Sequence, residues 1–328
     1  MPNSQRGCEY ELNPPEPNCL TEEDLDEDGV WRCPHDARVG ENLCIFHKPK
    51  SKKESEEVTQ AVLKAINDSP VKSDQLSEYR GTEFVGAKFG QLELSDQNII
   101  PQSTIDFRCA VFHDELSAKE TVFEGPVDFG GASFYSRVNF NGSSFESDLC
   151  FNNSKFRDLA QFKSISARDN VDFTDVVFDD AVLFRGSIFQ GPVDFSGSEF
   201  NHTVSGNFME SEFKYGLAFE NVNVRGEFGF EKAKFNSDVS LRMTRFNSKV
   251  AFNGMEINGN LNLDGTSFND HIFFTNRVFN TERLFEDSND ISDFAGEVQI
   301  SGEVTDLHRR KFKFEIERYL FSHASDNE

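Results

Sequence analysis

Long apolar runs are missing from this chain of 328 residues. No stretch approaches the ~18 apolar residues that a membrane-spanning helix needs. The start Met1-Pro2-Asn3-Ser4 also lacks the apolar core of a signal peptide. We therefore expect a cytoplasmic protein that makes no contact with a membrane.

Positive charge is scarce as well. The chain has 33 Lys and Arg against 57 Asp and Glu, which gives a formal net charge of −24. Such a surface repels nucleic-acid phosphates and anionic membranes, so direct nucleic-acid binding is not expected. Two interpretations of the acidity stay open. It is either a halophilic adaptation that keeps the protein soluble at high salt, or a surface that imitates DNA.

The sequence contains no recognisable set of side chains that would form a catalytic site. The seven His are scattered, and the chain has neither a Gly-rich phosphate loop nor a His-Glu-x-x-His helix. No Ser-His-Asp constellation can be recognised either. We expect a protein that is not an enzyme.

Phenylalanine, by contrast, is abundant and periodic. From Phe123 to Phe200, positions spaced alternately by six and five residues are Phe in fourteen of fifteen cases, and Ala167 is the exception. After a slip of two residues in the stretch 201–209, the pattern resumes at Phe213 and runs to Phe285. A repeat of eleven residues indicates a solenoid of stacked units. The slip is either a bulge that re-aims side chains or a tolerated insertion.

The repeat indicates short strands separated by turns. In Val127-Asp128-Phe129-Gly130-Gly131-Ala132-Ser133-Phe134, alternate residues of each short strand point inward, and Gly, Asn, Asp and Ser crowd the turns. Gly-Pro-Val-Asp-Phe occurs at 125–129 and again at 191–195, which is three times 22 residues apart. We therefore predict a parallel β-helix with four faces and about 22 residues per coil over residues 81–285. Phe should stack on Phe along its axis.

This pattern resembles the pentapeptide-repeat family, in a Phe-centred form typified by Phe-Ser-Gly-Ser-Glu-Phe at 195–200. The resemblance implies an all-β solenoid, a right-handed quadrilateral parallel β-helix. It also implies that partners are macromolecules, and that association through a C-terminal helix occurs in such proteins.

Residues 1–50 do not follow the repeat and hold four of the six cysteines. The two-residue gap in Cys44-Ile45-Phe46-His47 lets a thiolate and an imidazole reach one metal ion from a tight turn. Cys8 and Cys33 would complete a Cys3His tetrahedron, a ligand set typical of structural zinc. Cys19 and His35 are the substitutes, and unligated thiols or disulfides are the alternatives to zinc. Cys109 and Cys150 lie at outward repeat positions and are expected to be free thiols.

The same segment resembles the amino-terminal part of acidic pentapeptide-repeat proteins from haloarchaea. Val30-Trp31-Arg32-Cys33-Pro34-His35 and Leu43-Cys44-Ile45-Phe46-His47 carry that resemblance. It bears on where the protein is found rather than on an activity.

Two helices are expected outside the repeat. Residues 51–80 combine a charged linker with a short amphipathic helix, since Val58, Ala61, Val62, Ala65 and Ile66 fall at helical spacing. Its expected role is to cap the open end of the coil, and binding a partner is the alternative. Residues 286–328 contain a second apolar pattern at 305–321, for which we expect a helix that either caps the coil or forms a homodimer.

Together these features predict a non-enzymatic interaction or scaffold protein whose rigid acidic β-helix is presented to a protein partner. The alternative is an inhibitor of a type II topoisomerase that imitates DNA, as some acidic pentapeptide-repeat proteins do.

Overall fold

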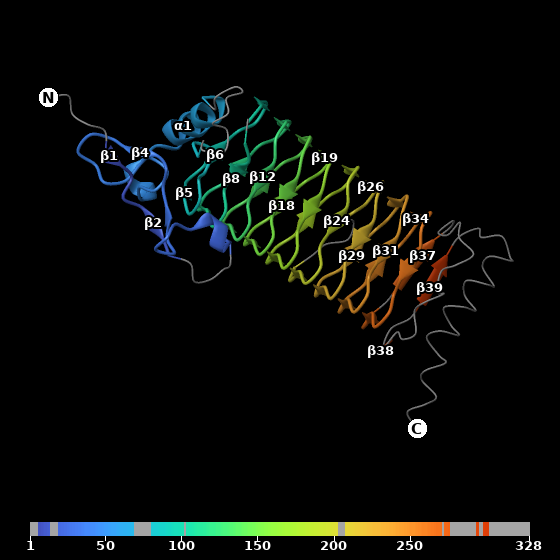
Figure 1. Ribbon diagram of the computed structural model, residues 1–328. Helices are drawn as coiled ribbons and strands as arrows, with labels where there is room; N and C mark the ends of the chain where they lie inside the picture. Colours follow the sequence, from blue (N-terminus) through green and yellow to red (C-terminus); the bar gives the residue numbers. More distant parts are fainter. Residues whose placement is uncertain are drawn as a thin grey trace.

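The computed structural model describes residues 6–13, 19–68, 80–101, 103–202, 207–270, 272–275, 293–294 and 298–301. Two parts follow one another along the chain. A small N-terminal module lies at one end of a long coil of parallel strands (Figure 1). The expected C-terminal helix at 305–321 lies outside the described residues, so capping or dimerisation through it stays a prediction.

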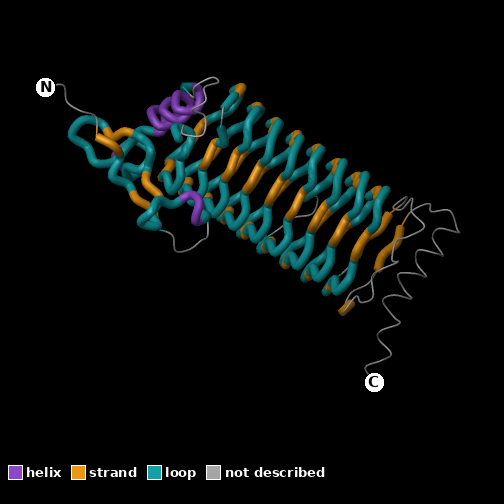
Figure 2. The backbone as a smooth tube through the Cα atoms, viewed as in Figure 1, coloured by secondary structure: helices purple, strands orange, loops and turns teal. Residues whose placement is uncertain are grey.

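The coil has four faces, and along each face the strands of successive coils pair in parallel (Figure 2). Face 1 consists of β5 (Lys88–Phe89), β9 (Val111–Phe112), β13 (Ser133–Phe134), β17 (Lys155–Phe156), β21 (Val177–Phe178), β25 (Glu199–Phe200), β28 (Asn223–Val224), β32 (Arg245–Phe246), β36 (Ser267–Phe268) and β38 (Asp293–Phe294). Face 2 begins with β6 (Leu92–Glu93), β10 (Leu116–Ser117), β14 (Val138–Asn139), β18 (Ala160–Gln161) and β22 (Val182–Leu183). It continues with β29 (Phe228–Gly229), β33 (Val250–Ala251), β37 (Ile272–Thr275) and β39 (Val298–Ser301).

The remaining two faces each hold eight strands. Face 3 consists of β7 (Asn98–Ile99), β11 (Val122–Phe123), β15 (Ser144–Phe145), β19 (Ser166–Ala167), β23 (Ile188–Phe189), β26 (Glu212–Phe213), β30 (Lys234–Phe235) and β34 (Glu256–Ile257). Face 4 consists of β8 (Ile105–Asp106), β12 (Val127–Asp128), β16 (Leu149–Cys150), β20 (Val171–Asp172), β24 (Val193–Asp194), β27 (Leu217–Ala218), β31 (Val239–Ser240) and β35 (Leu261–Asn262).

Register confirms the predicted coil of 22 residues. Phe134 pairs with Phe156, and Phe156 with Phe178, each 22 residues on. At the predicted slip the separation grows to 24, as in the pair Val193 and Leu217. Backbone bonding continues across it, because Phe184 N–H donates to the Asn207 carbonyl at 2.7 Å. The slip is therefore accommodated without breaking the stack.

Phe rings fill the centre of the coil and stack along its axis, as predicted. The ring centroids of Phe129 and Phe151 are 4.8 Å apart, those of Phe151 and Phe173 are 5.0 Å apart, and those of Phe173 and Phe195 are 4.8 Å apart. All four rings are buried. Offset stacking of aromatic rings adds to the free energy that their burial contributes.

The small residue of each repeat also joins the coils. The Ser198 hydroxyl donates to the Phe173 carbonyl at 2.6 Å and accepts from the Val176 N–H at 3.0 Å. Ser187 makes the same two bonds, to the Phe162 carbonyl and from the Ile165 N–H. The hydroxyls of Ser187 and Ser198 thus satisfy backbone groups inside the coil that strand pairing does not reach, whereas the buried hydroxyl of Ser154, at the same repeat position, has no hydrogen-bond partner in the described part of the chain.

The predicted helix near residue 60 is α1 (Ser55–Asn67). It buries Val58, Thr59, Val62 and Ile66, and it packs beside β6 in the first coil (Figure 1). The Thr59 hydroxyl accepts a hydrogen bond from the Glu93 N–H at 3.3 Å. Among the described helices, none combines the length and the apolar character that crossing a bilayer requires.

Candidate metal centre

The N-terminal module is built from four short strands and a turn. β1 (Arg6–Gly7) pairs with β4 (Asp36–Ala37), and β2 (Glu11–Leu12) pairs with β3 (Trp31–Arg32), both antiparallel. Two 3₁₀ turns, η1 (Glu22–Asp24) and η2 (Lys50–Lys52), complete it. This pairing brings the residues that follow β1 and β3, which are Cys8 and Cys33, to one side of the module.

The Cys44–His47 segment forms the tight turn that its spacing predicts. The N–H groups of His47 and Lys48 both donate to the Cys44 carbonyl at 3.2 Å. The turn places the Cys44 sulfur 3.2 Å from His47 Nδ1. Thiol and imidazole therefore point to the same space.

All four residues of the predicted Cys3His set meet there. The ligand atoms of Cys8, Cys33, Cys44 and His47 lie within 4.8 Å of one another. The Cys33 and Cys44 sulfurs are 3.7 Å apart, and the Cys8 sulfur is 3.8 Å from His47 Nδ1. Zinc–sulfur bonds of ~2.3 Å require tetrahedral edges of roughly 3.8 Å between sulfurs, so the observed spacing fits a zinc ion.

Neighbouring backbone groups orient these ligands. His47 Nε2 donates to the Val85 carbonyl at 2.9 Å, which leaves the Nδ1 lone pair directed at the cysteines. The Cys44 N–H donates to the Cys8 sulfur at 3.2 Å, and the His35 N–H donates to the Cys33 sulfur at 3.4 Å. Hydrogen bonds of this kind fix the tautomer of a histidine ligand and stabilise thiolates at metal sites.

Charge favours a cation at the centre of the cluster. The pKa of the Cys8 thiol is lowered, chiefly because Cys33 and Cys44 hydrogen-bond to its sulfur. The pKa of Cys33 is raised by its hydrogen bonds to Cys44 and Cys8 and by burial. The three sulfurs therefore do not all ionise unaided, and a divalent cation is what would hold them together as thiolates.

The two substitute ligands are used elsewhere. His35 Nε2 donates to the Glu83 carbonyl at 2.8 Å, and burial lowers the pKa of His35 to about 4. Cys19 is bonded to Cys109 as a disulfide, with Cα atoms 5.9 Å apart. Neither belongs to the four-residue cluster.

This disulfide makes one prediction wrong. Cys109 was expected to be a free thiol, but its place in a turn of the first coil lies against the segment that holds Cys19. Beside it, Arg108 pairs with Asp24 at 2.7 Å and with Asp106 at 2.8 Å. Cys150 is free, as expected.

The comparisons with known proteins concern the coil rather than the cluster. A family model described as "Pentapeptide repeats (9 copies)" matches residues 107–155 and 151–199. Residues 107–199 of the coil consist of pentapeptide repeats. Neither the curated proteins nor the solved structures gave a match.

The cluster is joined directly to the start of the coil. Lys88 of β5 donates its N–H to the Phe46 carbonyl at 3.0 Å, between the two ligands of the turn. His47 reaches the Val85 carbonyl in the same coil. The module thus bonds to backbone groups of the first coil, which no preceding coil is there to satisfy.

Several contacts of the cluster could not be recognised in the sequence. Tyr10 stacks on His47 with ring centroids 3.9 Å apart. Lys53 donates to the carbonyls of Ile45 and Phe46 at 2.9 and 2.8 Å, which places a cation beside the turn. Neither residue belongs to a spaced motif, so no sequence signal marks them.

Proposed function

We propose that this protein is a non-enzymatic interaction scaffold whose pentapeptide-repeat coil presents a rigid acidic surface to another protein. The observation that carries the proposal is the coil itself. Its backbone is bonded from coil to coil along four faces, so outward side chains are held at a fixed repeat. Such elongated surfaces are the features that solenoid proteins use for binding.

Partner class follows from charge. With a formal net charge of −24, the chain repels phosphates and anionic lipids, whereas it attracts basic proteins. We accordingly propose a protein partner, without direct contact to nucleic acid or membrane.

We further propose that zinc occupies the Cys3His cluster and serves as a structural staple. Four protein ligands close a tetrahedron and leave no open position for a substrate. The residues that would hold the ion are Cys8, Cys33, Cys44 and His47. The zinc would fix the module in the form that bonds to Val85 and Lys88 of the first coil.

Co-purification with the full-length chain tests the scaffold proposal. A basic protein recovered from a lysate of the source organism, and shown with purified components to bind in a saturable manner at physiological salt, would support it. If no protein binds the zinc-loaded chain in this way, the proposal is wrong.

Inhibition of a type II topoisomerase by DNA imitation is the second candidate. The observation that favours it is the column Asp106, Asp128, Asp172 and Asp194 on face 4. It places carboxylates at strand spacings of ~4.8 Å along the coil, against one phosphate per ~3.4 Å of helix axis on each DNA strand. Asp106 is buried and pairs with Arg108, so the exposed part of the column begins at Asp128. Cys150 interrupts the column, and Ala218, Ser240 and Asn262 follow it. A supercoiling assay at fixed ionic strength separates the candidates, because only the DNA-imitating surface would inhibit the enzyme.

A further inference from the structure

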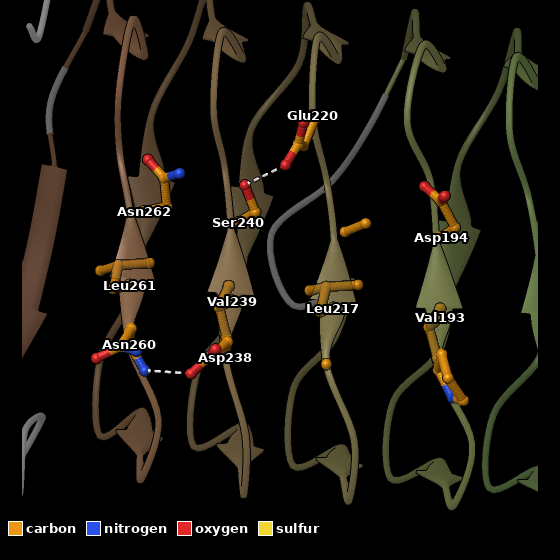
Figure 3. A pocket seen from close by; sticks show the side chains of 13 residues that line it. Val193, Asp194, Leu217, Glu220, Asp238, Val239, Ser240, Asn260, Leu261 and Asn262 are labelled. Carbon is orange, nitrogen blue, oxygen red and sulfur yellow. Dashed lines mark hydrogen bonds between the residues drawn. The ribbon is translucent and has the colours of Figure 1, made fainter. Parts of the chain in front are cut away.

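A groove lies on the outer side of face 4, in its C-terminal half (Figure 3). Its volume is about 570 Å³, within the range of ligand-binding sites. It runs across β24, β27, β31 and β35. The hollow arises because the outward position, which is Asp in β20 and β24, is Ala218 in β27 and Ser240 in β31.

The groove combines an apolar floor with acidic walls. The outward methyl of Ala218 and the backbone of β27 and β31 form the floor, because the side chains of Leu217 and Val239 are only 2% and 3% exposed. Asp194, Glu220 and Asp238 stand around it. Glu220 is already used, since it accepts from the Ser240 hydroxyl at 2.6 Å and from Arg242 at 3.2 Å. Asp194 and Asp238 each accept one backbone N–H, from Ser196 and Asn260, and neither has an ion-pair partner among the described residues.

Face 4 differs from the other faces in the number of Asp at its outward strand positions. Its outward strand positions hold four Asp and no Lys or Arg, whereas face 1 has Lys88, Lys155 and Arg245 against Glu199 and Asp293. Elsewhere on the coil, acids pair with cations of the neighbouring coil, as Asp179 does with Arg157 at 3.3 Å and Glu146 with Arg168 at 2.8 Å. At the start of face 4, Arg108 pairs with Asp106 and lies 3.8 Å from Asp128. Asp172 and Asp194 have no ion-pair partner among the described residues, so the later part of the face presents negative charge that these residues do not neutralise.

A ligand in this groove cannot bind by pairing with the strand backbone as an added β-strand. The Leu217 N–H donates to the Asp238 carbonyl, and the Phe219 N–H donates to the Ser240 carbonyl, so these strands are already bonded on both sides. A ligand must be held by side chains alone. Three strand spacings of ~4.8 Å span about 14 Å, the length of four or five extended residues.

We propose that this groove binds an extended, arginine-bearing segment of the protein partner. The methylene stem of an arginine would lie over Ala218, and its guanidinium would meet the carboxylates of Asp194 or Asp238. The inference rests on the proposed scaffold function and assigns it to one face of the coil.

Binding of a labelled pentapeptide, Ala-Arg-Ala-Arg-Ala, to the full-length zinc-loaded chain tests the assignment by fluorescence anisotropy. Asp194→Asn removes a charge of the groove, and Glu256→Gln removes one from an exposed position of face 3. Ala218→Gln fills the groove, and Ala251→Gln adds the same side chain at the equivalent outward position of face 2. We expect each groove variant to weaken binding about fivefold or more and each control to change it less than twofold.

Three results would overturn the proposal. They are no binding of the peptide, equal losses in groove and control variants, and displacement of the peptide by spermine at equal concentration, which would identify a site for small cations. Failure here is distinguishable from failure of the scaffold function, because a purified partner that still binds the Asp194→Asn and Ala218→Gln chains would leave the function intact and relocate its surface.

Discussion

If zinc occupies the Cys3His cluster as proposed, its removal should loosen the Cys44–His47 turn from the first turn of the coil, while the Cys19–Cys109 disulfide still ties the module to it. Two amides report on this contact directly: Cys44, whose N–H donates to the Cys8 sulfur, and Lys88, whose N–H donates to the Phe46 carbonyl. Both bonds depend on the turn that holds Cys44 and His47 in place. The coil further along, for example Phe173 N–H bonded to the Asp194 carbonyl, does not.

The size of the effect follows from linkage. A ligand present at 1,000 times its Kd stabilises the state that binds it by about 4 kcal/mol, which corresponds to about a thousandfold in hydrogen-exchange protection. Chelation should therefore accelerate exchange at Cys44 and Lys88 by up to this factor. Exchange at Phe173 should stay unchanged.

Hydrogen exchange with mass spectrometry, on the full chain with and without chelator, measures this difference. Metal analysis should give one zinc per chain, and cobalt substitution should give the sulfur-to-cobalt absorption of a tetrahedral thiolate site. His47→Ala should reproduce the effect of the chelator without added reagent. If metal is removed and exchange at Cys44 and Lys88 does not change, zinc does not hold the module on the coil.

The remaining predictions concern the coil and its covalent tie. Ser198→Ala should lower the free energy of unfolding, measured in urea, by about 1 kcal/mol, because the Phe173 carbonyl loses its buried donor. Ala132→Ser, at the equivalent position of another coil, should not lower it. Equal losses in the two variants would contradict this account. Gly142→Ala should lower the free energy of unfolding by about 1–2 kcal/mol, because Gly142 has a φ of +74° and a Cβ there would lie 3.2 Å from Glu120 Cγ. A melting temperature equal to that of the wild type would argue against this turn geometry. Cys109→Ser removes a disulfide that joins residues 90 positions apart. On the chain-entropy model, the free energy of unfolding of the zinc-loaded variant should be about 4–5 kcal/mol lower than that of the wild type. An unchanged urea midpoint would show that the pair is not oxidised in the folded protein.

How far the sequence predicts the coil is clear from individual residues. The spacing of Phe129, Phe151, Phe173 and Phe195 predicts both the four faces and the stacked rings, because each coil repeats the same local pattern. The hydrogen bonds of Ser187 and Ser198 are not predictable in this way. Their repeat position marks them as small, and Ala132 shows that a hydroxyl is not required there.

In the candidate metal centre, too, local features could be predicted from the sequence and long-range contacts could not. The turn Cys44–His47 is local, so its spacing predicts a thiol and an imidazole that point together. The meeting of Cys8 and Cys33 with that turn depends on two antiparallel strand pairs of only two residues each, which are too short for a pattern to be visible. The pairing of Cys19 with Cys109 joins residues 90 positions apart, and no periodicity links a module residue to a turn of the coil.

The bond from Lys88 to Phe46 has a consequence for the order of assembly. A parallel coil can add a turn only where a previous turn offers free carbonyls, so its first turn needs a template. Here the template precedes the coil in the chain and leaves the ribosome before it. Each later turn then finds its partner 22 to 26 residues behind it, already formed. Synthesis thus delivers the parts of this protein in the sequence in which each one becomes able to fold.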